Sequence, residues 1–210
     1  MGSGSSALLY AFAEAGRLAK GIGIELSESR SKFAEAWKRD GDYSMVTNMN
    51  GDFSGVGVDE AAWDWFVVID NTFTYLYPEN ALYPTGLLEK AMRSLKAGGY
   101  LLLDFINYAK REPDNEIRHW VAYAENDPYA YGLYSHKISN GINLSESIFV
   151  KRGGGESRKL EESKVYSLQE ISTLVASCGF EVDSVFATFD EQPFVEKESE
   201  RLVVLARKPG

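Results

Sequence analysis

The apolar positions of this chain fall into short runs, and their spacing alternates between the helical and the extended pattern. Apolar residues recur at helical spacing in residues 5–16 and 27–39, which predicts two amphipathic helices. Residues 21–25, Gly-Ile-Gly-Ile-Glu, and residues 44–49 have the pattern of short strands. The first 50 residues are therefore expected to alternate helix and strand.

Two continuous apolar runs follow, "WFVVID" at 65–70 and "YLLLDF" at 100–105. Such runs suit strands that are buried on both faces of a sheet. Residues 85–96 between them predict a helix, which Gly98-Gly99 is expected to end. This alternation of helices and strands predicts an α/β fold with a mostly parallel sheet and helices on both faces.

The pattern changes over residues 117–166, which are rich in aromatic and β-branched residues. Asn140-Gly141 lies between two alternating runs and is a strong hairpin signal, because both turn positions need a positive φ. Residues 153–155, three glycines, mark a second reversal. We therefore predict an antiparallel meander at 117–166, inserted into the α/β fold.

The last part of the chain returns to helix and strand. Ser167-Leu-Gln-Glu170 has the form of a capping box that opens a helix to Ser177. The stretches "FEVDSVFATF" and "RLVVLARK" then predict a closing antiparallel hairpin. A length of 210 residues is most simply one domain, so we expect a single domain over 1–210.

Composition narrows the function classes. The net charge is −9 and the sequence pI is near 4.9, which argues against nucleic acid and against an anionic membrane as partners. The single cysteine, Cys178, allows no internal disulfide, and Cys/His metal-ligand spacing is absent, so we expect no metal. The apolar runs are far shorter than the ~20 residues that span a bilayer, and no secretory leader is found. We expect a cytoplasmic protein; a homo-oligomer is compatible with the sequence.

Several residues suited to ligand binding follow the predicted strands, where open α/β sheets bind ligands. Gly2 and Gly4 let the backbone approach a ligand closely, and the helix after them points its N–H groups at it. Glu25 ends the next strand about 20 residues later, where a carboxylate accepts hydrogen bonds from ribose hydroxyls. Asp52 and Phe53 follow the third strand and offer an acceptor and an aromatic face to an adenine ring.

These stretches together resemble the class I, Rossmann-like methyltransferases that depend on S-adenosylmethionine. The resemblance is carried by "GSGSSALLYAFAEAG", "GIGIELS", "NGDF", "WFVVIDNTFTYL" and "LKAGGYLLLDF". The meander is similar to the insertion in small-molecule methyltransferases of the glycine and sarcosine type. The resemblance implies an enzyme that transfers a methyl group from S-adenosylmethionine to a small-molecule acceptor. The cofactor residues that it implies are Gly2, Gly4, Glu25, Asp52, Phe53 and Asp70.

The sequence departs from this family in two places. Ser6 stands where the family's loop usually has a third glycine. The family's first strand would precede Gly2, and this sequence lacks it, so we expect either a truncated product or a strand replaced by other means. Without it, the strands at 21–25 and 65–70 either close directly on each other or leave two open edges for an external segment.

We expect the acceptor pocket in the loop after the fifth strand and in the meander. No catalytic base is assigned, although His119 and His136 are candidates. Packing within the sheet is the competing interpretation for each aromatic residue. The predicted substrate-binding residues are Asn71, Tyr75, Tyr108, Arg118, Trp120 and Tyr134, and Tyr131 is a further candidate.

Two other functions stay open from the sequence. Residues 2–7 also satisfy the pattern G-x-G-x-x-[GA], which with Glu25 suits a nicotinamide-dependent reductase. Against it, no Tyr-x-x-x-Lys proton-donor pair occurs in the chain. The second alternative is a non-catalytic cofactor-binding or scaffold protein that has lost activity together with its first strand.

Overall fold

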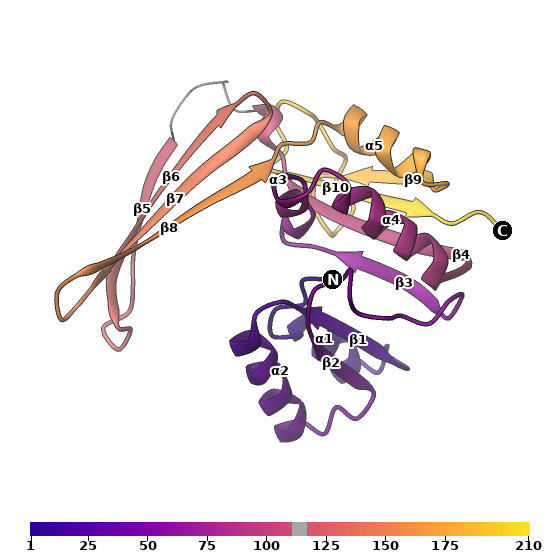
Figure 1. The fold of residues 1–210 in the computed structure, drawn as a ribbon, viewed down its shortest axis with the longest axis horizontal. Coiled ribbons are helices and arrows are strands. Elements are labelled where there is room, and N and C mark those ends of the chain that lie inside the picture. The colour runs from indigo at the N-terminus through magenta and orange to yellow at the C-terminus, as the bar shows by residue number, and fades with distance from the viewer. Residues whose placement is uncertain (111–116) are drawn as a thin grey trace.

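The computed structural model describes residues 1–110 and 117–210. Within these residues, two sheets carry the α/β part of the fold and a third forms a separate arm (Figure 1). The helices are α1 (Ala7–Glu14), α2 (Glu28–Asp40), α3 (Leu76–Glu79), α4 (Tyr83–Ser94) and α5 (Leu168–Ser177), with 3-10 turns η1 (Thr72–Tyr75) and η2 (Tyr108–Lys110). The strands are β1 (Gly21–Glu25), β2 (Val46–Asn50), β3 (Trp63–Val68), β4 (Leu95–Ile106), β5 (Ile117–Ala122), β6 (Tyr129–Ser139), β7 (Ile142–Lys151), β8 (Glu156–Lys164), β9 (Glu181–Phe186) and β10 (Arg201–Arg207).

The smaller α/β sheet is the parallel pair β1–β2, in register from Gly21 opposite Val46 to Glu25 opposite Asn50. Helices α1 and α2 pack against this pair. Ser27 caps α2 by accepting a hydrogen bond from the backbone N–H of Arg30, which agrees with the helix predicted over 27–39.

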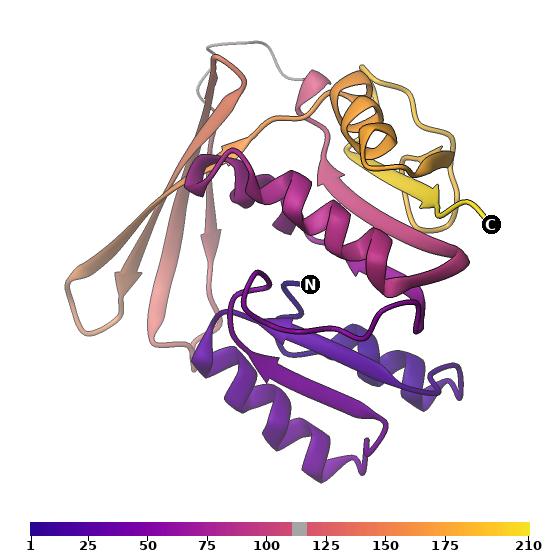
Figure 2. The same cartoon turned by 45° about the vertical axis from the view of Figure 1, so that its right-hand side comes forward.

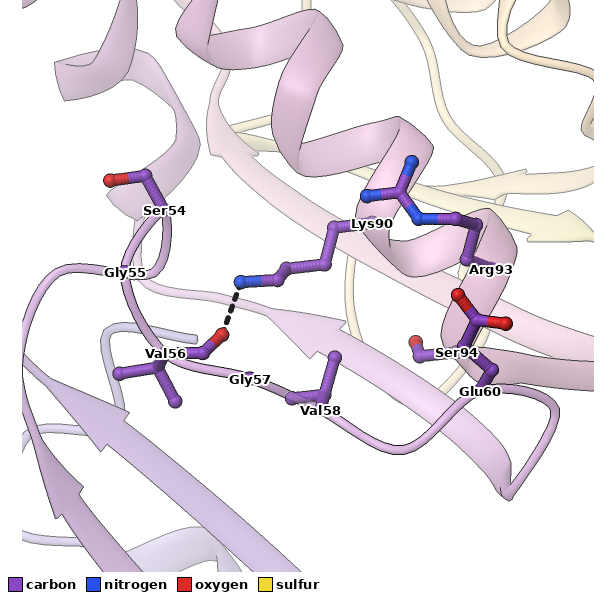
Figure 3. A pocket seen from close by; sticks show the side chains of 9 residues that line it. All are labelled: Ser54, Gly55, Val56, Gly57, Val58, Glu60, Lys90, Arg93 and Ser94. Atoms are coloured by element: carbon purple, nitrogen blue, oxygen red, sulfur yellow. Dashed lines mark hydrogen bonds between the residues drawn. The ribbon is translucent and has the colours of Figure 1, made fainter.

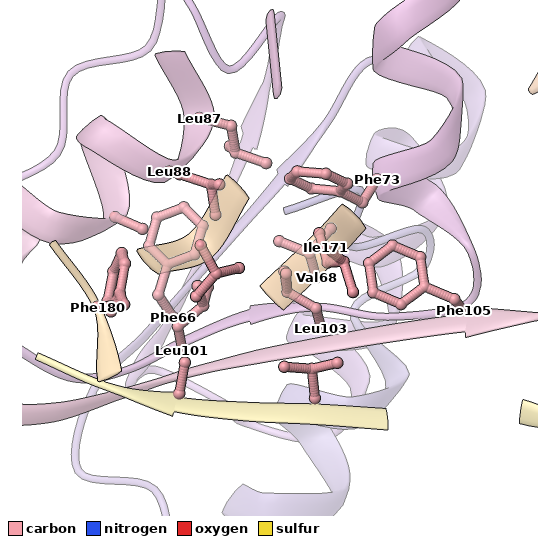
Figure 4. Packing of buried hydrophobic residues seen from close by; sticks show 14 of the residues in the cluster. Phe66, Val68, Phe73, Leu87, Leu88, Leu101, Leu103, Phe105, Ile171 and Phe180 are labelled. Carbon is pink, nitrogen blue, oxygen red and sulfur yellow. The ribbon is translucent and has the colours of Figure 1, made fainter. Parts of the chain in front are cut away.

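The larger sheet has the strand order β3-β4-β10-β9, with β3 parallel to β4 and β10 antiparallel to both of its neighbours. Its core packs against α4 and α5 (Figure 4). The capping box at the start of α5 forms as predicted. The shared apolar residues include Phe66, Val68, Phe73, Leu87, Leu88, Leu101, Leu103, Phe105, Ile171 and Phe180. The predicted α/β fold with an antiparallel final hairpin is confirmed.

Two local expectations are wrong. Helix α4 ends at Ser94 and β4 begins at Leu95, so Gly98 lies inside the strand instead of ending the helix. The reason is tertiary pairing: Leu95 is in register with Trp63, and the N–H of Gly98 donates to the carbonyl of Lys208. In addition, β3 is not buried on both faces, since the side chain of Trp65 is 52% exposed.

The arm is the antiparallel sheet β5-β6-β7-β8, which projects from the rest of the molecule (Figure 2). Asn140 and Gly141 form its tight turn with φ of 52° and 72°, so the predicted meander and hairpin are confirmed. Strand β8 contacts η1 and α3, which connects the arm to the residues that follow β3.

Strands β1 and β3 are not paired with each other, and each is the edge of its sheet in the described residues. The N-terminal residues lie between the two edges (Figure 1). The amino group of Met1 donates to the carbonyl of Val67 at 2.8 Å, and the N–H of Ser3 donates to the carbonyl of Ile24 at 3.0 Å. Of the two arrangements expected from the sequence, direct closure does not occur: β1 and β3 stay unpaired with each other, and the N-terminal residues make one backbone hydrogen bond to each. No helix among the described residues is long and apolar enough to cross a membrane.

Candidate functional site

The loop at residues 1–6 covers the carboxyl end of β1. Gly4 has a φ of 55°, and a Cβ added to it would meet no atom within 4 Å, so its backbone faces open space. Gly2 also has a positive φ, but a Cβ there would lie 2.4 Å from Cγ2 of Thr72. The loop therefore favours glycine at both positions, for the left-handed φ at Gly4 and for the close packing on Thr72 at Gly2.

Glu25 is the last residue of β1 and is only 8% exposed. Its two carboxylate oxygens accept hydrogen bonds from the N–H groups of Gly4 and Ser27, each at 2.8 Å. A carboxylate oxygen has more than one lone pair, so the group can still accept from a ligand hydroxyl while its orientation is held. The glycine loop and the acid are thus one hydrogen-bonded unit.

Ser6 occupies the position where a third glycine was expected, and its φ of 59° is left-handed. This conformation is strained for a residue with a side chain. Oγ of Ser6 donates to Oδ1 of Asn48 on β2 at 2.6 Å, and the amide nitrogen of Asn48 donates to Tyr10 and Glu35. Ser6 therefore ties the loop to β2, which a glycine could not do.

The turn after β2 presents Asp52 and Phe53. Oδ1 of Asp52 accepts from the N–H and the hydroxyl of Ser54 at 2.7 Å and 2.6 Å, and these bonds lower the pKa of Asp52. Phe53 is 8% exposed and packs edge-on against Tyr83 of α4, with ring centroids 5.7 Å apart. The turn thus combines an ionised acceptor with a fixed aromatic ring.

The turn after β3 holds Asp70 and Asn71 in left-handed conformations, with φ of 57° and 60°. The N–H of Asp70 donates to the carboxylate of Asp104 at 2.8 Å, and Oδ1 of Asn71 accepts from the N–H of Ile106 at 3.1 Å. Asn71 is 5% exposed, so its amide is part of the support of the turn. Asp70 is exposed at the carboxyl end of β3.

Tyr75 lies one turn further along η1 and is 38% exposed. Its pKa is raised, chiefly by partial burial and then by the negative charge of Glu161 on β8, with smaller effects from Tyr108 and Asp70. Tyr108 is 4% exposed. The 3-10 turn η1, which contains Tyr75, contacts both β4 and, in the arm, β8.

The register of the arm divides the predicted acceptor residues between two faces. His119 is opposite Tyr134, whereas Arg118 is opposite Ser135 and Trp120 is opposite Leu133. Because neighbouring residues of a strand point to opposite faces, Arg118 and Trp120 cannot share a face with Tyr134. The expectation that all these side chains line one pocket is therefore wrong.

The face with Tyr134 also carries Glu161, whose negative charge helps to raise the pKa of Tyr75. His136 is opposite Ser145, and Ser145 is opposite Glu161, so these residues share the face of Tyr134. The rings of His119 and Tyr134 stack at 5.1 Å, and those of His119 and His136 at 5.8 Å. The two histidines thus belong to a row of rings on this face.

The opposite face carries an apolar groove lined by Trp120, Ala122, Ala130, Tyr131 and Leu133. Trp120 is 70% exposed and Tyr131 is 45% exposed. This groove therefore lies on the face of the arm opposite to the face that carries Glu161.

Sequence reasoning did not find Asp104, Arg201 or Lys90. Asp104 and Arg201 form an ion pair under the Asp70–Asn71 turn, and Lys90 donates to the turn after β2. An acid inside the apolar run "YLLLDF" was the one available signal, because a buried carboxylate needs a partner. Nothing in the sequence near Lys90 or Arg201 marks them as partners.

Comparison with known proteins finds no matching family model and no match among curated proteins. Solved structures do match. The CcbJ methyltransferase from Streptomyces caelestis is similar with a TM-score of 0.85 at 19% identity, over 100% of this chain and 82% of that one. An S-adenosylmethionine-dependent methyltransferase from Clostridium acetobutylicum ATCC 824 gives 0.81 at 15% identity, over 100% and 82%. SAM-bound CalS10, an amino pentose methyltransferase from Micromonospora echinaspora, gives 0.72 at 15% identity, over 99% and 80%. The chain has the class I fold of these methyltransferases, as the resemblance implied.

Proposed function

We propose that this protein transfers a methyl group from S-adenosylmethionine to a small-molecule acceptor. The observation that carries the proposal is the unit formed by Gly4 and Glu25 at the end of β1. It places an open glycine backbone beside a carboxylate whose orientation is held by backbone N–H groups. The fold shared with methyltransferases supports the same function.

The residues present fit this cofactor. Glu25 would accept hydrogen bonds from the two ribose hydroxyls, and Gly4 would let the backbone approach the ribose. Asp52 would accept from the adenine amino group, and Phe53 would pack against the adenine ring. Asp70, exposed after β3, would face the methionine end. Gly2 would support the loop through its packing on Thr72.

Bound S-adenosylmethionine supplies a methyl group already activated on a sulfonium. The protein therefore has mainly to position the acceptor in line and to exclude water. Tyr75 keeps its proton at neutral pH, because the ordinary pKa of tyrosine is near 10 and partial burial raises it further. Its hydroxyl could therefore hydrogen-bond the methyl acceptor near the end of β3. Tyr108, Asn71 and the arm face with Tyr134 would complete the pocket.

An acceptor that arrives protonated needs a base. His119 and His136 stay candidates for that role, since they lie on the same arm face as Glu161, the residue whose charge reaches Tyr75. The structure neighbours include an amino pentose methyltransferase and a sugar N-methyltransferase, which supports a small acceptor.

Titration calorimetry with S-adenosylhomocysteine and with NADH tests the proposal. We expect binding of S-adenosylhomocysteine and none of NADH. Binding of NADH alone would favour the reductase. Binding of S-adenosylhomocysteine without methyl transfer to any of a broad panel of small amines and alcohols would favour a non-catalytic binding protein.

A further inference from the structure

Lys90 reaches from α4 to the loop that joins β2 to β3. Its ammonium group donates to the carbonyl oxygens of Phe53 and Val56, and Figure 3 shows the side chain extended toward Val56. Lys90 lines a pocket between this loop and α4, and Arg93, one turn further along α4, lines it too. In Figure 3 the guanidinium of Arg93 does not reach the loop.

The turn itself explains why a cation fits here. The N–H groups of Gly55 and Val56 both donate to the carbonyl of Asp52 at 3.1 Å, so the turn is wound like the end of a helix. The carbonyl groups of Phe53 and Val56 are not used inside it. Carbonyl groups at such an end carry partial negative charge, which an ammonium group compensates.

The hydrogen bonds of Lys90 to the turn require its ammonium group to be partly dehydrated, which costs free energy. Burial lowers the pKa of Lys90, and the positive charge of Arg93 lowers it further, while Asp52 opposes both. No carboxylate of the described residues forms an ion pair with Lys90. A lysine is thus partly dehydrated in order to bind two main-chain carbonyls of one particular turn.

We propose that Lys90 is a positioning residue, which locks the Asp52–Val56 turn in the conformation that presents Asp52 and Phe53 to the adenine ring. This inference rests on the proposed function. Tyr83 supports the same turn from the side, through its edge-on contact with Phe53. Together the two α4 residues would set the distance between the adenine acceptor and the ribose acceptor, Glu25.

The test compares the affinities of Lys90→Met, Lys90→Arg and the control Arg93→Met for two ligands. One is S-adenosylhomocysteine. The other is S-inosylhomocysteine, which lacks the adenine amino group. We expect Lys90→Met to bind S-adenosylhomocysteine about tenfold more weakly and to lose most of its preference over the inosine analogue. The affinity of Lys90→Arg for S-adenosylhomocysteine should stay within about threefold of the wild-type affinity. Arg93→Met should bind both ligands as the wild type does.

The preference for adenine separates positioning from stability, because a general loss of stability would weaken both ligands alike. If Lys90→Met does not fold, Lys90→Gln, whose amide can still donate to one carbonyl, is measured in its place and should lose part of the preference. Unchanged affinity and preference in the folded variant would overturn the role of Lys90. A wild-type protein that binds neither ligand would overturn the proposed function, and this inference with it.

Discussion

Arg201 on β10 and Asp104 on β4 form a two-point ion pair directly below the turn after β3. Nε of Arg201 donates to Oδ1 of Asp104 at 2.7 Å, and a second guanidinium nitrogen donates to Oδ2. Oδ2 also accepts from the N–H of Asp70 at 2.8 Å. Asp104 is fully buried, so one carboxylate joins the last strand of the sheet to a turn of the candidate site.

Replacement of Arg201 by methionine should lower the free energy of unfolding by about 2–3 kcal/mol. The reason is that it leaves the Asp104 carboxylate buried without its cation; the figure is below the usual range because Arg201 is partly exposed. The double variant Asp104→Leu/Arg201→Met should be more stable than Arg201→Met alone, since no buried charge remains.

The matched control for Arg201 is Lys96→Met. Lys96 pairs with Asp64 at 2.8 Å, but both side chains are exposed, so its loss should cost less than about 1 kcal/mol. Urea unfolding measures all three variants. Equal losses for Arg201→Met and Lys96→Met would contradict the buried role of the pair.

Two substitutions of Ser6 separate its backbone strain from its hydrogen bond. Ser6→Ala removes the bond to Asn48 and keeps the left-handed strain, so it should destabilise the protein by about 1–2 kcal/mol. Ser6→Gly removes the same bond but also the strain, and should be about 1 kcal/mol more stable than the alanine variant. Chemical denaturation would refute this account if the glycine variant were the less stable one.

Replacement of Glu25 by alanine should weaken binding of S-adenosylhomocysteine by about 1.5–3 kcal/mol, the range of charge-assisted hydrogen bonds. Glu28→Ala is the control, because Glu28 lies three residues away and pairs with Lys32 on the exposed surface of α2. Calorimetry should find the control unchanged. An unchanged dissociation constant in folded Glu25→Ala would make Glu25 a structural residue of the loop.

Substitutions near the two faces of the arm should affect methyl transfer differently. Tyr75→Phe should lower kcat/KM for methyl transfer about tenfold, because it removes one hydrogen bond next to the reacting groups. Trp120→Ser should leave kcat/KM within about twofold, since Trp120 lies on the opposite face from Tyr134. Assays with labelled S-adenosylmethionine measure kcat/KM for both variants. A larger loss for Trp120→Ser than for Tyr75→Phe would show that the face with Trp120 belongs to the acceptor site.

The pH dependence of the same reaction tests the state of Tyr75. Its pKa is raised above 10, so the hydroxyl keeps its proton throughout the range from pH 7 to pH 9. The wild type and Tyr75→Phe should therefore have pH profiles of the same shape over this range. A limb that disappears in Tyr75→Phe would show that Tyr75 ionises during the reaction.

The open edges of β1 and β3 predict that an added strand stabilises the protein. An extension upstream of Met1 by an apolar strand of about 5–6 residues should raise the melting temperature and the turnover, because it supplies main-chain partners to both edges. A Gly/Ser extension of equal length is the control and should raise neither. Equal melting temperatures for the two extended variants would mean that the edges do not accept a strand.

Short-range sequence signals determined the bounds of several helices, strands and turns of this protein. The bounds of β1, the Asn140-Gly141 turn and the Ser167–Glu170 capping box all follow from residues a few positions apart. The positions of Glu25 and Asp52 at strand ends were predictable for the same reason. Such features depend on local backbone preference, which each short segment carries by itself.

Only the tertiary structure decided the features that join distant segments. Asp104 and Arg201 are 97 residues apart, and Lys90 is 37 residues from Phe53. The end of α4 at Ser94 also depended on pairing with β3 and β10, which outweighed the local preference of Gly98. Likewise, Tyr134 and Trp120 were separated by strand register. In each case the deciding energy comes from a partner elsewhere in the chain, and no local pattern encodes which partner that is.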